Sequence, residues 1–210
     1  RINATFDIFW RNNYDLIGPT PTQGGGGEIV RPANMASMKS RGQEFSLQTQ
    51  NFKLKDFSWT TNLIFSHVTT EVTDLMSQVR TMDLISQNGF AVVGYPYRGL
   101  FSIPYAGLDE HGIPQLYTPE GEKTSTDIDF QNRDKNSYLI YEGPSDPTIT
   151  GSFGNEFRYK NWRLNIFVTY NFGNVIRLDP VFRAKYSDLT AMTKEYRNRF
   201  MQSGDENITS

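Results

Sequence analysis

The side chains that could act as acids, bases, nucleophiles or metal ligands are thinly spread along this chain of 210 residues. Cysteine is absent, and the two histidines, His67 and His111, have no partner at the spacing of a metal site. No Gly-x-Ser-x-Gly motif marks a serine nucleophile. The sequence therefore predicts no catalytic residue, no metal site and no cofactor.

Two further motifs resemble ligand-binding loops but lack essential positions. Asp127 and Asp129 are spaced as in a calcium loop, yet the positions that need Gly and Glu are Asn132 and Tyr138. The glycines at 24–27 have neither the Lys nor the helix start of a phosphate-binding loop. We interpret the first motif as a solvated acidic loop and the second as a mobile loop tip.

Aromatic side chains are grouped in the long segment 79–137. Tyr97, Phe101 and Tyr105 lie there between motifs that are typical of turns. Rings offer a large contact area to a sugar or a peptide at a low entropic cost. We therefore predict these three residues as substrate-binding residues. The alternative, a loop that packs on its own rings, stays open.

The elements that position these loops are indicated by residues that alternate between apolar and polar types. From Trp162 to Phe172 every second residue is apolar, and Arg163, Asn165 and Asn171 fall between them. Successive side chains of a strand point to opposite faces, so such a strand has one apolar face. We predict about five strands of this kind, near residues 2–11, 42–51, 57–67, 151–160 and 162–172.

Strand lengths and connections are typical of a membrane barrel. A bilayer is crossed by about 9–11 tilted strand residues, and outer-membrane barrels have short inner turns and long outer loops. The rings of Trp59, Tyr159 and Trp162 lie near strand ends, where an interfacial girdle is expected. We therefore predict extracellular loops at 12–41, 68–150 and 173–210.

This pattern predicts an all-β protein, an antiparallel transmembrane β-barrel segment in the outer membrane of a Gram-negative bacterium. The smallest single-chain barrels have about eight strands, so these strands are expected to belong to a larger barrel. The net charge of -2 gives no electrostatic footprint for nucleic acid. Polar side chains of the second face are predicted to line the lumen: Glu44, Gln48, Gln50, Glu156, Arg158, Asn165 and Asn171.

In the tail after Gly173 the spacing of apolar residues changes from every second residue to every third or fourth residue. Asp179 suits a helix N-cap and Pro180 suits the first helical position. Apolar residues then recur at three- and four-residue spacing from Phe182 to Phe200. This spacing predicts a short amphipathic loop helix, which binds the membrane surface or packs on the barrel rim or a partner.

Three sequence blocks resemble the SusC/RagA family of TonB-linked outer-membrane transporters. They occur in the family's order and cover nearly the whole chain. The blocks are Met38-Lys39-Ser40-Arg41-Gly42-Gln43-Glu44-Phe45, then Gly94-Tyr95-Pro96 with Tyr105-Ala106-Gly107-Leu108-Asp109, and finally Gly143-Pro144 with Gly151-Ser152-Phe153 and Phe157-Arg158-Tyr159-Lys160.

The resemblance implies the C-terminal part of a barrel of about 22 strands, with the family's N-terminal plug absent from this chain. It also implies import of oligosaccharide or peptide cargo, coupling to TonB through the plug, and a SusD/RagB-type surface lipoprotein as a lid. Outer-membrane lipid would surround the barrel. From the residues alone, an outer-membrane barrel hydrolase and a soluble carbohydrate-binding β module remain alternatives.

Overall fold

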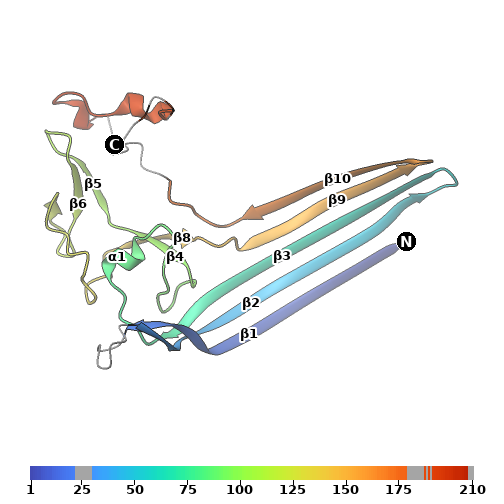
Figure 1. The fold of residues 1–210 in the computed structure, drawn as a ribbon, viewed down its shortest axis with the longest axis horizontal. Helices are drawn as coiled ribbons and strands as arrows, with labels where there is room; N and C mark the ends of the chain where they lie inside the picture. The colour runs from blue at the N-terminus through green and yellow to red at the C-terminus, as the bar shows by residue number, and fades with distance from the viewer. Residues whose placement is uncertain (22–29, 179–186, 188, 190, 208–210) are drawn as a thin grey trace.

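The computed structural model describes residues 1–21, 30–178, 187, 189 and 191–207, and its largest part is one long antiparallel sheet (Figure 1). The strand order is β1–β2–β3–β9–β10. The two short turns lie at one end of the sheet with the N-terminus, and the longer connections gather at the other end (Figure 1). The strands are β1 (Ile2–Pro21), β2 (Val30–Lys53), β3 (Phe57–Leu75), β9 (Ile149–Tyr159) and β10 (Trp162–Phe172).

The register keeps most of the apolar residues of these strands on one face of the sheet. Phe45 of β2 lies opposite Phe6 of β1 and Phe65 of β3. Leu63 of β3 lies opposite Phe153 of β9. A slip of one residue would move the whole set to the other face, so this register is strongly specified. The apolar face carries Ile2, Phe6, Ile8, Trp10, Phe45, Leu47, Leu63, Phe65, Phe153, Phe157, Trp162, Leu164, Ile166 and Val168.

A row of rings crosses the apolar face near the short turns. Trp59 stacks between Phe52 and Phe157, with ring centroids 5.8 and 5.5 Å apart. The indole Nε1 of Trp59 donates to the side-chain oxygen of Asn155 at 2.9 Å, and the hydroxyl of Thr61 donates to the same oxygen at 2.8 Å. These polar atoms of the apolar face therefore bond to one another, which lowers the cost of placing them away from water.

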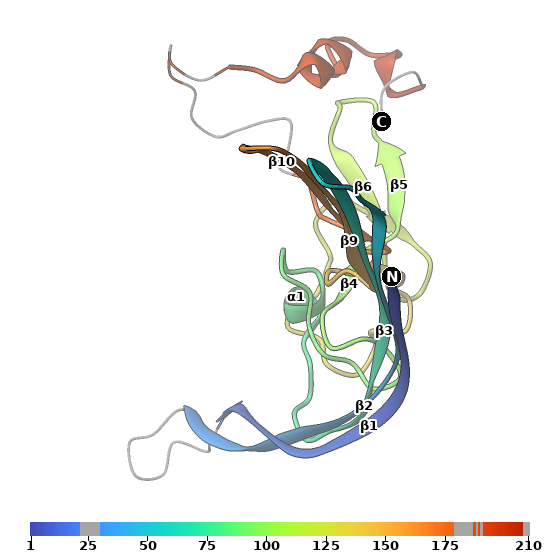
Figure 2. The same cartoon turned by 90° about the vertical axis from the view of Figure 1, so that its right-hand side faces the viewer.

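β1 and β2 extend well beyond the residues that alternate in the sequence. They have 20 and 24 residues, about twice the length that crosses a bilayer. A bulge lies between Asn13 and Leu16, where Asp15 has a φ of 54°. Because a bulge interrupts the alternation and bends the strand, the pattern stops there although pairing continues. The loops predicted at 12–41 and 68–150 thus begin later than expected, and the hairpin bends away from the sheet (Figure 2). The glycines at 24–27 lie outside the described residues.

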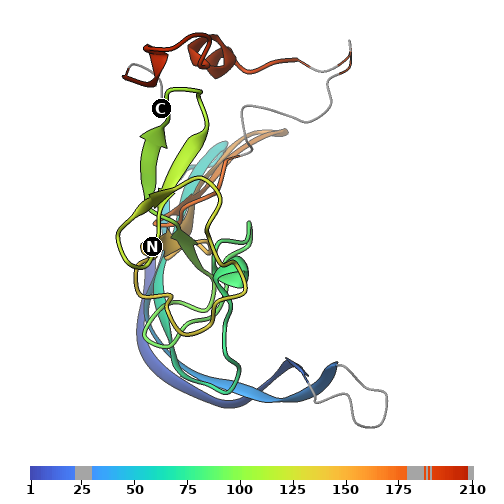
Figure 3. The same cartoon turned by 90° about the vertical axis from the view of Figure 1, so that its left-hand side faces the viewer.

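Residues 76–148, called the loop domain below, pack around a core of their own. Leu84, Phe101 and Leu139 are buried in it, and Thr81 is buried beside them. Figure 3 shows this unit from the loop end of the molecule. Its elements are α1 (Thr81–Leu84), the pair β4 (Gly99–Ser102) and β8 (Ile140–Pro144), and the small sheet of β5 (Tyr105–Leu108), β6 (Pro114–Tyr117) and β7 (Lys123–Thr124).

The tail does not continue as the predicted helix where the structure describes it. Residues 179–186, 188 and 190 lie outside the described residues, and the remainder forms two short 3-10 helices, Lys194–Asn198 and Asp205–Asn207. Phe200 packs directly against Gly112, in the turn between β5 and β6. Among the described residues, no helix has both the length and the apolar character to cross a membrane.

Candidate functional site

The polar face of the sheet holds the residues that the sequence predicts to line a lumen. Glu156 of β9 lies opposite Thr60 of β3 and Asn165 of β10, and Glu44 of β2 lies opposite Ser66 of β3. The register brings together on this one face Glu44, Gln48, Gln50, Glu156, Arg158, Asn165 and Asn171. A polar solute or a polar protein surface therefore meets many hydrogen-bond donors and acceptors here.

Three charged side chains on the polar face form ion pairs that are open to solvent. Glu156 Oε1 lies 3.3 Å from Arg158 Nη2 and 3.4 Å from Arg163 Nε. Nearby, the side-chain amide of Asn3 donates to Gln48 Oε1 at 3.5 Å. Exposed pairs of this kind contribute little to stability. Their groups can therefore exchange partners with a solute at low cost.

Two phenylalanines interrupt the polar face, and each lies over a glycine. The ring of Phe9 covers Gly42, and the ring of Phe167 lies against Gly154 so closely that a Cβ there would be 2.9 Å from the ring. Phe9 and Gly42 are opposite each other in the register, as are Phe167 and Gly154. A glycine leaves room for a facing ring to lie flat on the sheet. The sequence signal for this pairing, a Gly opposite a Phe, becomes visible only once the register is known.

The three predicted substrate-binding residues occupy different environments in the loop domain. Phe101 is 5% exposed and packs with Tyr95 and Tyr141, with ring centroids 5.1 and 5.3 Å away. Its ring therefore belongs to the core, and the alternative interpretation of self-packing applies to it. Tyr97 and Tyr105 are 50% and 46% exposed. The structure records no ring contact between these two tyrosines and Phe101 among the described residues.

An ion pair fixes the start of α1 within the loop domain. Arg80 donates from Nε and Nη2 to the two carboxylate oxygens of Asp83 at 2.9 and 2.8 Å. These bonds hold the pKa of Asp83 below its ordinary value. The hydroxyl of buried Thr81 donates to Asn136 Oδ1 at 2.7 Å. Such satisfied polar contacts give the loop domain a defined conformation.

The remaining candidate groups are separated by the fold. His67 lies on the apolar face of β3 opposite Gln43, whereas His111 lies beside Glu110 in the loop domain. Asp129 accepts a hydrogen bond from the backbone N–H of Gln131 at 2.9 Å. In the part of the chain that the structure describes, no three His, Cys, Asp or Glu side chains form a metal-binding group.

Comparison with known proteins identifies relatives of this sequence, although no family model matches the chain. The sequence is 24% identical over 193 residues to TonB-dependent receptor P3 of Formosa agariphila, covering 84% of this chain and 19% of the relative. It is 23% identical over 228 residues to TonB-dependent receptor P39 of the same organism, covering 85% of this chain and 21% of the relative. The chain therefore spans about a fifth of the length of these relatives.

Solved structures show the same fold. The RagAB peptide transporter superimposes with a TM-score of 0.64 and 24% identity, over 83% of this chain and 19% of the other. The RagAB peptide importer in its closed-closed state gives a TM-score of 0.63 over the same shares. The expectation of an antiparallel outer-membrane barrel segment is thereby confirmed. This chain resembles, in sequence and in fold, one part of a TonB-dependent receptor of the SusC/RagA type.

Proposed function

We propose that this chain forms part of the wall and outer loops of a TonB-dependent importer. The observation that carries the proposal is the division of one sheet into an apolar and a polar face. The apolar face suits lipid, and the polar face suits a lumen that holds a plug or passes cargo. The short turns would lie in the periplasm, and the loop domain would lie outside the cell.

The proposed cargo is a peptide or an oligosaccharide. A peptide is favoured because the RagAB proteins, which share this fold, are named as a peptide transporter and importer. The relatives' names are those of receptors and of a transporter, which favours import over a hydrolase. A SusD/RagB-type lipoprotein would cover the loop domain, and TonB would act through a plug that lies outside this chain.

Import can be tested in cells that depend on a defined nutrient. Cells that carry the complete receptor should grow on a peptide mixture as the nitrogen source, and deletion of its gene should slow that growth. Collapse of the proton gradient should stop uptake but leave surface binding intact. Uptake of peptides that survives both gene deletion and collapse of the gradient would contradict the proposal. The same test with oligosaccharides distinguishes the two cargo classes.

We expect Tyr97→Ala and Tyr105→Ala to weaken cargo binding by the complete receptor. A ring that stacks on a sugar or a peptide contributes about 1 kcal/mol beyond simple burial, so each change should raise Kd by about fivefold. Both side chains are about half exposed, so the loop domain should keep its stability. Isothermal titration with cargo, combined with thermal unfolding, measures the two effects separately.

Phe130→Ala is the matched control, because Phe130 is 45% exposed in the same loop domain but lies in the acidic segment. It should leave the Kd for cargo unchanged. Equal affinities in all three variants and the unchanged receptor would show that the two tyrosines do not contact cargo.

A further inference from the structure

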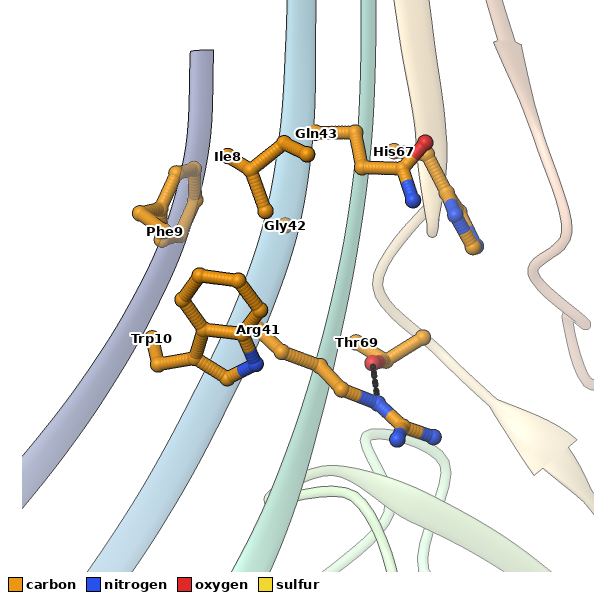
Figure 4. Close-up of a pocket in the computed structure, with 8 residues that line it drawn as sticks. All are labelled: Ile8, Phe9, Trp10, Arg41, Gly42, Gln43, His67 and Thr69. Carbon is orange, nitrogen blue, oxygen red and sulfur yellow. Dashed lines mark hydrogen bonds between the residues drawn. The ribbon is translucent and has the colours of Figure 1, made fainter.

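A groove on the apolar face of the sheet contains the positively charged side chain of Arg41, although lipid is expected to cover this face (Figure 4). It runs across β1, β2 and β3, and Figure 4 shows the indole of Trp10 beside Arg41. Arg41 and Thr69 are direct partners in the register, and Arg41 Nε donates to Thr69 Oγ1 at 3.3 Å. The groove is lined by Ile8, Phe9, Trp10, Arg41, Gly42, Gln43, His67 and Thr69.

Unlike Lys39 on the same strand, Arg41 has no carboxylate partner among the described residues. Lys39, two positions earlier on β2, pairs with Glu71 at 3.0 Å. Arg158 on the polar face pairs with Glu156 at 3.3 Å. The Nε–H group of Arg41 donates to the neutral hydroxyl of Thr69. Its two Nη groups have no hydrogen-bond partner among the residues that the structure describes. An exposed guanidinium with free Nη groups is suited to a bidentate anion such as a phosphate.

The depth of Arg41 in the membrane can be estimated from its distance to the row of rings near the short turns, which includes Phe52. Phe52 and Arg41 are about eleven residues apart on β2, which corresponds to roughly 36 Å along the strand. With strands tilted by about 45°, this distance is a height of roughly 26 Å, close to the ~25 Å apolar band of outer-membrane barrels. Trp10, 75% exposed beside Arg41, then belongs to the second aromatic girdle. Arg41 thus lies where the hydrocarbon ends and headgroups begin.

We propose that Arg41 and Thr69 bind the phosphate of an outer-leaflet lipid headgroup, with Trp10 packed beside it. A lipid fits better than cargo or plug, because the groove opens on the apolar face and continues into Phe45 and Leu47, along which an acyl chain can lie. The assignment to the outer leaflet rests on the proposed orientation, in which the loop domain is extracellular. This lipid would then hold the barrel at a fixed depth and tilt.

The test uses the purified complete receptor in phosphatidylcholine nanodiscs, with a fluorescent phosphorylated glycolipid as the probe. Arg41→Gln should weaken probe binding about fivefold, and Arg41→Lys should keep only part of the affinity, because an ammonium cannot form the bidentate contact. Removing the phosphates from the probe should have the same effect as Arg41→Gln. Arg11→Gln is the matched control, since Arg11 is on the polar face of β1 and lies over the ring of Phe9 at 4.2 Å. It should leave probe binding unchanged.

Each other outcome overturns the proposal. Equal binding by Arg41→Gln and the unchanged receptor, at equal unfolding midpoints, would show that Arg41 does not bind the headgroup. An equal loss in Arg11→Gln would indicate a general charge effect. Complete competition by millimolar inorganic phosphate would indicate an ion site rather than a lipid site. Failure of nutrient import would leave these results unaffected, because no cargo or energy source is present in the assay.

Discussion

Ile166→Arg is expected to destabilise the assembled barrel by about 2–4 kcal/mol, the cost of arginine on a lipid face near the bilayer midplane. Ile166 lies in the middle of β10 on the apolar face, opposite Asn155, and is 50% exposed although it is apolar. Contact between lipid and the exposed apolar surface of Ile166 is favourable. An arginine at this position would lose the water around its guanidinium, which costs free energy. The measurement is reversible unfolding of the complete receptor in phospholipid vesicles by a denaturant.

Asn165→Arg provides the control for this prediction. Asn165 is the preceding residue on the same strand, and it lies on the polar face opposite Glu156. An arginine there stays in water near a carboxylate, so we expect a change within about 0.5 kcal/mol, as for an ordinary surface substitution. Equal losses of stability at the two positions would mean that the faces are assigned incorrectly.

Phe101→Ala is expected to destabilise the loop domain by about 3–5 kcal/mol, as truncation of a buried phenylalanine usually does. The ring of Phe101 is 5% exposed and packs with Leu84 and Leu139. The guanidinium of Arg177, in the tail, donates to the carbonyl oxygen of Phe101 at 2.6 Å. Loss of the ring should therefore loosen both the pair β4–β8 and the tail that rests on it.

Hydrogen exchange of the complete receptor can separate this local effect from the barrel. Amides of β4 and β8 should exchange faster by a factor of at least about a hundred, while amides of β9 and β10 stay protected. Tyr105→Ala, at a half-exposed ring of the same domain, should leave the exchange rates unchanged. Unchanged protection of β4 and β8 in Phe101→Ala would show that the ring is not part of a cooperative core.

Alternation in the sequence indicates strands well where every residue keeps its face. β10 is observed at Trp162–Phe172, and no bulge interrupts its pairing with β9. β1 shows the opposite case, because the bulge beside Asp15 changes which residues face outward. The alternation of apolar and polar residues stops at such a bulge, whereas the backbone hydrogen bonds between the two strands continue beyond it.

The candidate site was harder to predict for a different physical reason. Phe101 and Tyr105 are both aromatic residues near turns, and nothing local distinguishes a buried ring from an exposed one. Burial of Phe101 depends on Leu139 and Tyr141, far away in the sequence. Likewise, the lack of an acidic partner for Arg41 could not be recognised before the register placed Thr69 beside it.

The central claim is that one face of this sheet meets lipid and the other meets water. It is tested most directly by single cysteines along β10, a chain region without native cysteine, in the complete receptor with its other cysteines removed. A water-soluble maleimide should label positions 163, 165 and 169 and leave 164, 166 and 168 unlabelled. When each cysteine instead carries a fluorophore, a lipid-soluble quencher should reduce the fluorescence at positions 164, 166 and 168 and leave it unchanged at 163, 165 and 169. Uniform labelling of all six positions by the water-soluble reagent would contradict the account.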